Sequence, residues 1–196
     1  MSNLYRVAVY CASALGTDPA YREAASALGR SLAEAGMGLV YGGASVGLMG
    51  AVADAALAAG AEVIGVLPQL LMTREIAHSG LSQMIPTATM HERKAKMIEL
   101  ADAMIALPGG YGTLDEMMEA LTWAQLGIHA KPVGLLNVAG YWDRLLAFVD
   151  HMRAERFVRP EQREALLVAG SPAELIARMA GYQPVVLDKW IDRSQT

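Results

Sequence analysis

The sequence has almost no cysteine, which excludes two common ways of stabilising a fold. Cys11 is the one cysteine among 196 residues, so no intrachain disulfide can form and a cysteine-based zinc site is not expected. No His, Lys or Arg stands beside Cys11 in the sequence to activate its thiol, which favours a place in the core over a nucleophilic role. We predict a protein without a bound metal and without a cofactor.

Long hydrophobic runs and an excess of positive charge are also missing. No apolar run has the length that crosses a membrane, and residues 1–6 lack the pattern of a signal peptide. We therefore expect a cytoplasmic protein without a membrane partner. The formal net charge is −4 at pH 7, which argues against nucleic acid bound through a basic surface.

What the sequence does have in quantity is apolar residues. Hydrophobic residues make up 54% of the chain and charged ones 18%, as is typical of a globule with a large buried core. A chain of this length fits one domain. We predict a single domain over residues 1–196, in which a tail from about residue 183 is peripheral.

Short apolar runs alternate along the chain with segments of helical period. Strands are expected at residues 7–10, 39–41, 62–67, 83–86, 103–107, 132–137 and 166–168, with helices in most of the intervals. This alternation predicts the α/β class, as a doubly wound parallel sheet with helices on both faces. Ligands of such sheets bind at the carboxyl ends of the strands.

Residues 108–116 join an expected strand to an expected helix and read Pro-Gly-Gly-Tyr-Gly-Thr-Leu-Asp-Glu. Three glycines let the backbone approach a ligand closely, and the free N–H groups at a helix start favour an anion. The combination predicts a phosphate-binding turn made by Gly109, Gly110, Tyr111, Gly112 and Thr113.

Glu116 stands in what we expect to be the first turn of that helix. At about 100° per residue it shares a side with Glu119 and Trp123, opposite the apolar side made by Leu114, Met117, Met118 and Leu121. We expect Glu116 to point away from the core, with its ionised form favoured by the helix N-terminus. An acid in a first turn can also simply complement the helix dipole, but the neighbouring glycine turn favours a role at a site.

A second glycine-rich turn, residues 42–50, follows the expected strand 39–41. Its spacing is G-G-x-x-x-G rather than the G-x-G-x-x-G of dinucleotide-binding folds, and the acidic residue expected after the next strand is missing. We interpret this turn as a second anion or ligand site, in which Gly42 and Gly43 lie near a nucleotide other than NAD.

Four more polar residues lie in loops that follow strands, where binding residues collect. Ser13 and Thr17 follow the first strand, and either ligand binding or ordinary capping would explain them. Glu75 and His78 lie in residues 69–82, an expected loop with one helical turn, where a solvated side chain is the alternative to a ligand contact.

Arg93 and Lys94 flank the apolar stripe of the helix expected at residues 89–101. Two cations beside an apolar face either extend along the edge of the core or border a pocket and bind a phosphate or carboxylate. Both alternatives are open at this point.

Four segments together resemble the LONELY GUY family of cytokinin riboside 5′-monophosphate phosphoribohydrolases, whose bacterial members were often labelled lysine decarboxylases. The segments are YGGASVGLMG at 41–50, MHERK at 90–94, PGGYGTLDE at 108–116 and TWAQLG at 122–127. The resemblance covers most of residues 5–180. The glycine motif together with the upstream Arg-Lys pair is specific, although either alone would be weak.

The resemblance implies a Rossmann-like fold and hydrolysis of a nucleoside 5′-monophosphate, AMP included, to free base and ribose 5-phosphate. It makes Arg93 and Glu116 catalytic, and Lys94, Glu75, Thr122 and residues 110–113 substrate-binding; the glycine turns and the first loop add Gly109, Gly42, Gly43 and Ser13. It also implies a homodimer with the active sites at or near the interface.

Trp123 gives a second reason to expect a dimer. It lies on the side of its helix that we expect to be exposed, where a tryptophan is unusual unless a partner or a ligand covers it. The alternative is a base stacked on Trp123 within one subunit.

Two other functions compete with the hydrolase. A lysine decarboxylase would need pyridoxal phosphate on a lysine, and none of Lys94, Lys96, Lys131 and Lys189 lies in a convincing site of that kind, so we reject that label. A non-catalytic nucleotide or cofactor carrier would use the same turns without needing Arg93 and Glu116.

Overall fold

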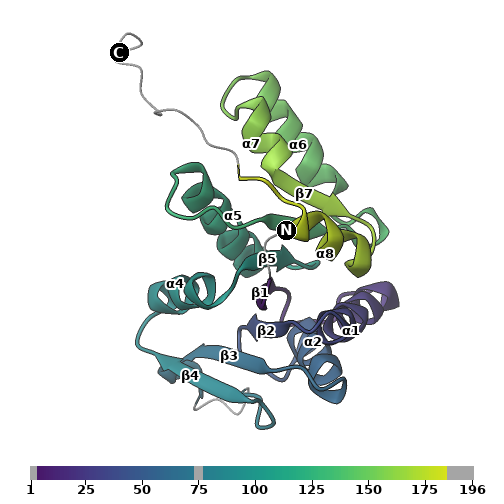
Figure 1. Cartoon of the computed structure of the whole chain (residues 1–196), viewed down its shortest axis with the longest axis vertical. Coiled ribbons are helices and arrows are strands. Elements are labelled where there is room, and N and C mark those ends of the chain that lie inside the picture. The colour runs from purple at the N-terminus through teal and green to yellow at the C-terminus, as the bar shows by residue number, and fades with distance from the viewer. Residues whose placement is uncertain (1–3, 73–76, 185–196) are drawn as a thin grey trace.

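Seven parallel strands form one sheet in the order β4-β3-β2-β1-β5-β6-β7 (Figure 1). The computed structural model describes residues 4–72 and 77–184. The strands are β1 (Arg6–Tyr10), β2 (Gly38–Tyr41), β3 (Val63–Pro68), β4 (Gln83–Thr87), β5 (Ala103–Ala106), β6 (Val133–Leu136) and β7 (Leu166–Ala169). The expected α/β class with a doubly wound parallel sheet is confirmed.

Helices cover both faces of the sheet (Figure 1). One face packs against α1 (Pro19–Glu34), α2 (Gly47–Ala58) and α8 (Pro172–Ala180), and the other against α4 (Met90–Leu100), α5 (Tyr111–Gln125) and α6 (Asp143–Ala154). The remaining helices are the short α3 (Gln69–Met72), α7 (Pro160–Ala165) and the 3₁₀ turn η1 (Val138–Gly140). The single turn expected within 69–82 is α3, whereas α7 and η1 were not expected, because six and three residues are too few for a helical period to show.

Alternation along β1 divides the core between the two faces. Val7 and Val9 belong to the core under α1, α2 and α8, whereas Ala8 and Tyr10 belong to the core under α4 and α5. Because β1 is covered on both sides, it reads as a continuous apolar run rather than as an alternating one.

The strand order places a topological switch between β1 and β5. From β1 the chain builds outward to β4, then returns to β5 on the other side of β1 and builds outward to β7. Successive connections therefore leave β1 and β5 in opposite directions, which opens a crevice at their carboxyl ends. The loop after β1 and the glycine turn after β5 both begin at this crevice.

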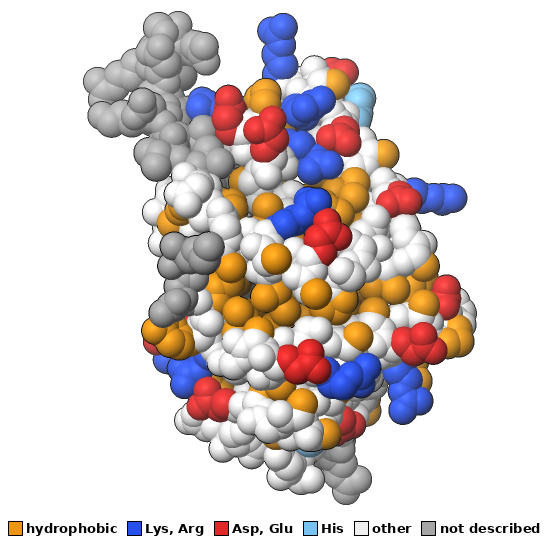
Figure 2. All heavy atoms as spheres, turned by 45° about the vertical axis from the view of Figure 1, so that its right-hand side comes forward, with side chains coloured by type: hydrophobic (Ala, Val, Ile, Leu, Met, Phe, Trp, Pro, Cys, Tyr) orange, Lys and Arg blue, Asp and Glu red, His pale blue; other side chains and the backbone are white. Residues whose placement is uncertain are grey.

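Within the part of the chain that the structure describes, no helix has the length and apolar character needed to cross a membrane. On the face drawn in Figure 2, acidic and basic side chains are intermixed around a band of hydrophobic ones, without a continuous basic area.

Close packing of α1 against α2 depends on Gly29. A Cβ added there would collide with the backbone oxygen of Val52 and come within 2.9 Å of the Ala56 nitrogen. The two helix backbones meet at this point, so neither can yield by a side-chain rotation.

We expect Gly29→Ala to lower the melting temperature of the protein. Alanine favours a helix over glycine by about 1 kcal/mol, but overpacking costs roughly 1–3 kcal/mol, so the steric term should decide the sign. Thermal unfolding followed by circular dichroism measures it, with the exposed neighbour Arg30→Ala as control. A melting temperature equal to or above that of the unmodified protein would show that α1 and α2 separate at no cost.

Candidate active site

A cavity of about 390 Å³ lies at the crevice between β1 and β5. It is lined by the loop after β1, the glycine turn after β5 and side chains of α2, α4 and α5: Cys11, Ala12, Ser13, Ala14, Met49, Met90, Arg93, Gly110, Tyr111, Gly112, Thr113, Asp115 and Glu116. Hydrogen bonds of Ala12 join its loop to both glycine turns, because the Ala12 N–H donates to the Pro108 carbonyl and the Leu48 N–H donates to the Ala12 carbonyl.

Arg93 and Glu116 form a buried ion pair in the wall of this cavity. Their side chains are 10% and 9% exposed, and the Arg93 guanidinium donates to the Glu116 carboxylate. The Arg93 Nε also donates to the carbonyl of Val66 in β3 at 3.0 Å. The contact therefore fixes Glu116 against both α4 and the sheet, and in this structure Arg93 orients Glu116.

The expected orientation of Glu116 is wrong. The buried side of α5 is made by Thr113, Glu116, Met117 and Ala120, so Glu116 faces inward. It also lies in the second turn, since α5 begins at Tyr111 and has no acidic residue in its first turn. The apolar pattern misleads here because a carboxylate is tolerated on a buried side when a cation such as Arg93 pairs with it.

Burial raises the pKa of the Glu116 carboxyl above its ordinary value, and the Arg93 guanidinium opposes this shift. Asp115 adds to the rise, while Lys94 acts against it. Burial also raises the pKa of the Cys11 thiol, with Glu116 adding to the effect. Cys11 is thus a neutral wall of the cavity, in agreement with the preference for a core residue.

The glycine turn presents backbone to the cavity. A Cβ at Gly109 would collide with the Thr113 side chain, whereas the positions of a Cβ at Gly110 and Gly112 are open space. The Tyr141 hydroxyl donates to the Gly109 carbonyl at 2.7 Å and so holds the turn from the side of η1. The first N–H groups of α5 have no acceptor within the helix, which suits an anion in the cavity.

The second glycine turn serves packing in the structure. A Cβ at Gly42 would overlap the Arg93 guanidinium, so glycine is required there for Arg93 to reach Glu116. Gly43 has φ +77° and packs against Leu67 and Met84. Both glycines are buried and neither lines the cavity, so their assignment as substrate contacts stays a prediction.

Three further residues assigned to the substrate are not brought into the cavity of this chain, or cannot be placed. The Lys94 ammonium pairs with Asp115 and Glu119 at 3.1 and 3.2 Å. Thr122 is exposed, and its hydroxyl donates to the Met118 carbonyl at 2.7 Å. Glu75 lies outside the described residues.

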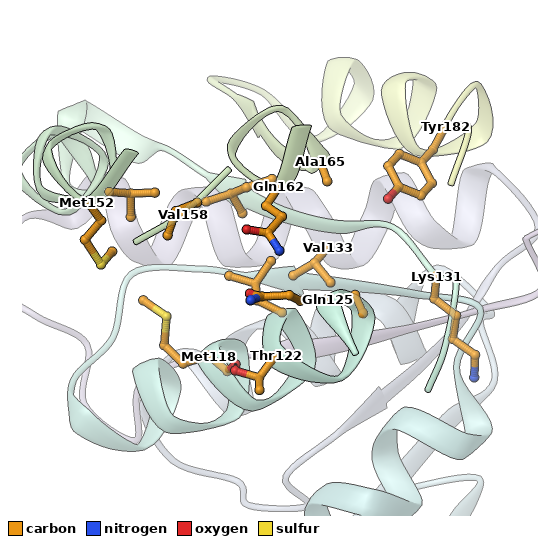
Figure 3. Close-up of a pocket in the computed structure, with 14 residues that line it drawn as sticks. Met118, Thr122, Gln125, Lys131, Val133, Met152, Val158, Gln162, Ala165 and Tyr182 are labelled. Atoms are coloured by element: carbon orange, nitrogen blue, oxygen red, sulfur yellow. The ribbon is translucent and has the colours of Figure 1, made fainter. Parts of the chain in front are cut away.

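Thr122 instead borders a separate, mostly apolar cavity of about 230 Å³ between α5, α6 and α7 (Figure 3). Met118 and Gln125 of α5 line this space together with Met152, Val158 and Gln162 from the other side. Leu121 and Met118 are half-buried and line this cavity. Part of the apolar stripe of α5 therefore faces the cavity, and the stripe does not coincide with the most buried side of the helix.

The other candidates divide between the site and the scaffold. Ser13 is exposed and lines the cavity, whereas Thr17 does not, and the N-cap of α1 is Asp18. His78 pairs with Asp54 at 2.9 Å and accepts a hydrogen bond from the Gly80 N–H, which ties a loop to α2.

Trp123 is only half-exposed and packs against the core under α5, so the expectation of an exposed tryptophan is wrong.

Sequence reasoning did not single out Met49 and Met90, which add apolar side chains to the lining of the cavity. Both methionines stand inside the motif segments, but a methionine in a helix usually indicates core. Tyr141 was missed as well, because its support of Gly109 spans 32 residues and nothing local indicates it.

Comparisons with known proteins identify a family model and several relatives that match most of the chain. Residues 49–179 match a family model described as "possible lysine decarboxylase". The chain is 50% identical over 183 residues to a cytokinin riboside 5′-monophosphate phosphoribohydrolase of Arabidopsis thaliana, which covers 93% of this chain and 84% of that protein. A protein of the same name from Oryza sativa subsp. japonica is 49% identical over 183 residues, or 93% of this chain and 76% of the relative.

Solved structures share the fold. A molybdenum cofactor binding protein from Rippkaea orientalis superposes with a TM-score of 0.69 at 25% identity, covering 92% of this chain and 98% of that chain. The molybdenum cofactor carrier protein of Chlamydomonas reinhardtii gives a TM-score of 0.67 at 24% identity, covering 91% and 98%, and this second likeness concerns the fold alone.

Proposed function

The chain belongs to the LONELY GUY family of cytokinin riboside 5′-monophosphate phosphoribohydrolases, and on this premise we propose that it hydrolyses the N-glycosidic bond of purine riboside 5′-monophosphates, including AMP and prenylated AMP. The products are the free base and ribose 5-phosphate. The observation that carries the proposal is the buried Arg93–Glu116 pair in the wall of a cavity that also presents a helix N-terminus. We place this activity in the cytoplasm.

The reaction breaks the bond between the ribose C1′ and the base nitrogen. Positive charge develops on the ribose as the base leaves, so an ionised carboxylate beside C1′ stabilises the transition state. Glu116 supplies that carboxylate, and it also accepts a proton from the attacking water, whose oxygen bonds to C1′. The electron pair of the broken C1′–N bond leaves with the base, which takes up a proton from solvent. Arg93 keeps Glu116 ionised and oriented through their direct contact.

The glycine turn holds the 5′-phosphate in this proposal. Open space at Gly110 and Gly112 lets the phosphate approach the backbone N–H groups of α5. Binding energy from this group, which does not react, positions the sugar against Glu116. The apolar wall at Met49 and Met90 is the complementary surface for the base.

The decarboxylase description of the family model does not suit the described residues. Lys94 is paired with two carboxylates, Lys96 pairs with Glu99, and the Lys131 ammonium donates to the Ile98 carbonyl. None of these three lines the cavity of Arg93 and Glu116. A carrier without catalytic activity is the second candidate, which the molybdenum cofactor proteins of the same fold favour; the buried ion pair favours the hydrolase.

We expect Glu116→Gln to lower kcat by about a hundredfold or more while nucleotide binding survives, because it removes the charge but keeps the size of the side chain. Arg93→Ala should also lower kcat severely, and the double variant should lose much less than the sum, since the two residues act as a unit. Asp115→Asn is the matched control and should change kcat less than either.

The measurement is the steady-state release of base from AMP and from isopentenyladenosine monophosphate, with lysine as a negative control. Circular dichroism confirms the folding of each variant. A folded Glu116→Gln protein with unchanged kcat would return Glu116 to a structural role. Bound AMP that survives overnight incubation with the unmodified protein would favour the carrier.

The 5′-phosphate is expected to be required for efficient hydrolysis. Adenosine lacks the group that the glycine turn binds, so its kcat/KM should be lower than that of AMP by about a hundredfold or more. Chromatography of the released adenine measures both substrates under the same conditions. Comparable kcat/KM values would mean that the turn after β5 does not hold a phosphate.

We also propose a homodimer that uses the exposed side of α5. Tyr111, Leu126 and Ile128, at the two ends of α5, are 93%, 57% and 61% exposed. Between them a shallow hollow of α5 is lined by Tyr111, the half-buried Leu114 and Thr122, and Tyr111 also lines the cavity of the candidate site. Exposed apolar areas of this kind are typical of protein interfaces. The hollow includes Thr122, so a second copy seated there would bring Thr122 to an interface beside the active site.

Light scattering at micromolar concentration should therefore give the mass of a dimer. Ile128→Glu places a charge in the proposed interface and should shift the protein toward the monomer. Arg30→Glu is the control, because Arg30 is exposed on α1, which covers the opposite face of the sheet from α5. A monomer mass for the unmodified protein would contradict the proposal.

A further inference from the structure

The loop after β6 places a tyrosine against the glycine turn at residues 108–116. Because β6 pairs with β5 in parallel, the two strands end side by side and the loops that follow them are neighbours. Tyr141, in the loop after β6, donates its hydroxyl to the Gly109 carbonyl at 2.7 Å. Tyr141 stands outside the four segments that carry the family resemblance, and it does not line the cavity of Arg93 and Glu116.

The loop holds Tyr141 in a defined position. The Asn137 side chain accepts a hydrogen bond from the Trp142 N–H at 2.8 Å and donates one to the Asp143 carboxylate at 2.7 Å. Ala139 has φ +49° and ψ +32°, a left-handed conformation that is unfavourable for a residue with a Cβ. Such a conformation persists where the surrounding structure imposes it, and functional sites are where it is commonest.

Aromatic contacts fix the ring of Tyr141 as well. It meets the ring of Tyr21 in α1 edge-on, with the ring centroids 5.5 Å apart, and the ring of the buried Trp142 edge-on at 4.8 Å. Edge-to-face contact is a favourable geometry for aromatic pairs. A change that removes only the hydroxyl keeps these ring contacts, so the hydrogen bond to Gly109 can be tested apart from the packing.

The hydroxyl acts on a peptide unit that joins two glycines. Gly109 supplies the carbonyl of this unit and Gly110 supplies its N–H. Among the described residues no peptide bond is cis, so the carbonyl and the N–H of this planar unit point in opposite directions. A unit between two glycines rotates more readily than others, because neither residue has a Cβ. Fixing the Gly109 carbonyl therefore fixes the direction of the Gly110 N–H.

The orientation of this unit matters for an anion. Gly109 is buried, whereas Gly110 is exposed, lines the cavity and is the N-cap of α5. Tyr141 holds the carbonyl on the side of η1. A unit rotated by half a turn would present an oxygen where the N–H now lies, and an oxygen repels the phosphate that an N–H binds.

We propose that Tyr141 is a positioning residue of the phosphate site. Its hydroxyl holds the peptide unit between Gly109 and Gly110 with the N–H toward the 5′-phosphate and the carbonyl away from it. This inference rests on the proposed hydrolase function and assigns part of the affinity for phosphate to a residue outside the glycine turn. The effect is confined to ligands that carry a phosphate, because the bond does not involve Arg93 or Glu116.

The test compares ligands with and without a phosphate in Tyr141→Phe, which removes the hydroxyl and keeps the ring. One hydrogen bond corresponds to a change of about threefold to tenfold in an equilibrium constant, so kcat/KM for AMP should fall by that factor. The dissociation constant of ribose 5-phosphate, measured by isothermal titration calorimetry, should rise by the same factor. Adenosine lacks the phosphate, so its kcat/KM should stay within about twofold of its original value.

Tyr21→Phe is the matched control, since it removes the hydroxyl of the neighbouring ring and leaves the bond from Tyr141 to Gly109 in place. It should leave the preference for AMP over adenosine unchanged. An equal loss with both substrates in Tyr141→Phe would show a general structural role and overturn the inference, as would an unchanged affinity for ribose 5-phosphate. If Tyr141→Phe does not fold, Asn137→Ala decides, because it frees the Trp142 N–H and loosens the loop; an unchanged preference for AMP in that variant contradicts the inference.

Calorimetry with ribose 5-phosphate needs no turnover, so it separates this positioning role from the hydrolase. A protein that releases no base, but in which Tyr141→Phe weakens the binding of ribose 5-phosphate, would refute the hydrolase and retain the role of Tyr141. An active protein whose affinity for ribose 5-phosphate ignores the hydroxyl would retain the hydrolase and refute that role.

Discussion

A buried ion pair between α4 and α5 is the interaction on which the arrangement of the site depends. Arg93 and Glu116 are both almost inaccessible to water, and a charge in such a place is tolerated only when a partner and further hydrogen bonds compensate it. The bond from Arg93 to the Val66 carbonyl supplies one of these. Removal of either partner would leave the other charge buried without compensation, so the pair determines how the two helices meet the sheet.

Two of the glycines near the site are explained by the protein side chains that pack against them rather than by a ligand. Gly42 is required because the guanidinium of Arg93 occupies the space of its Cβ, and Gly109 because the Thr113 side chain does so. The glycines that leave open space are Gly110 and Gly112. The turn at residues 108–116 thus contains one glycine, Gly109, that makes room for a protein side chain, and two, Gly110 and Gly112, that leave room for a substrate phosphate.

Charge on the facing sides of α4 and α5 extends the same principle beyond the pair itself. Lys94, Asp115 and Glu119 continue the row of opposite charges outward from Arg93 and Glu116. Such a row resists sliding and rotation of one helix on the other, because every shift separates several pairs at once. Apolar packing below it, through Met97 and Met117, would by itself tolerate small rotations.

The sequence alone determined the α/β class, the strand segments and the two residues at the centre of the proposed chemistry. Apolar runs and glycine turns are local features, and the resemblance to the phosphoribohydrolases rests on motifs that are contiguous in the chain. Local periodicity predicted the wrong side for Glu116, since it counts a carboxylate as exposed regardless of what pairs with it. The exposed placement of Trp123 failed because it relied on the same assignment of the exposed side of α5, whereas Trp123 packs against the core.

Only the tertiary structure decided which residues share the cavity and which support it. The switch between β1 and β5 brings the loop at Cys11 to the glycine turn about a hundred residues later in the sequence. It also directs Lys94 toward α5 and places Thr122 over a different cavity. These assignments depend on the strand order and on how each helix is rotated against its neighbours, and both arise from contacts between distant segments that no local pattern encodes.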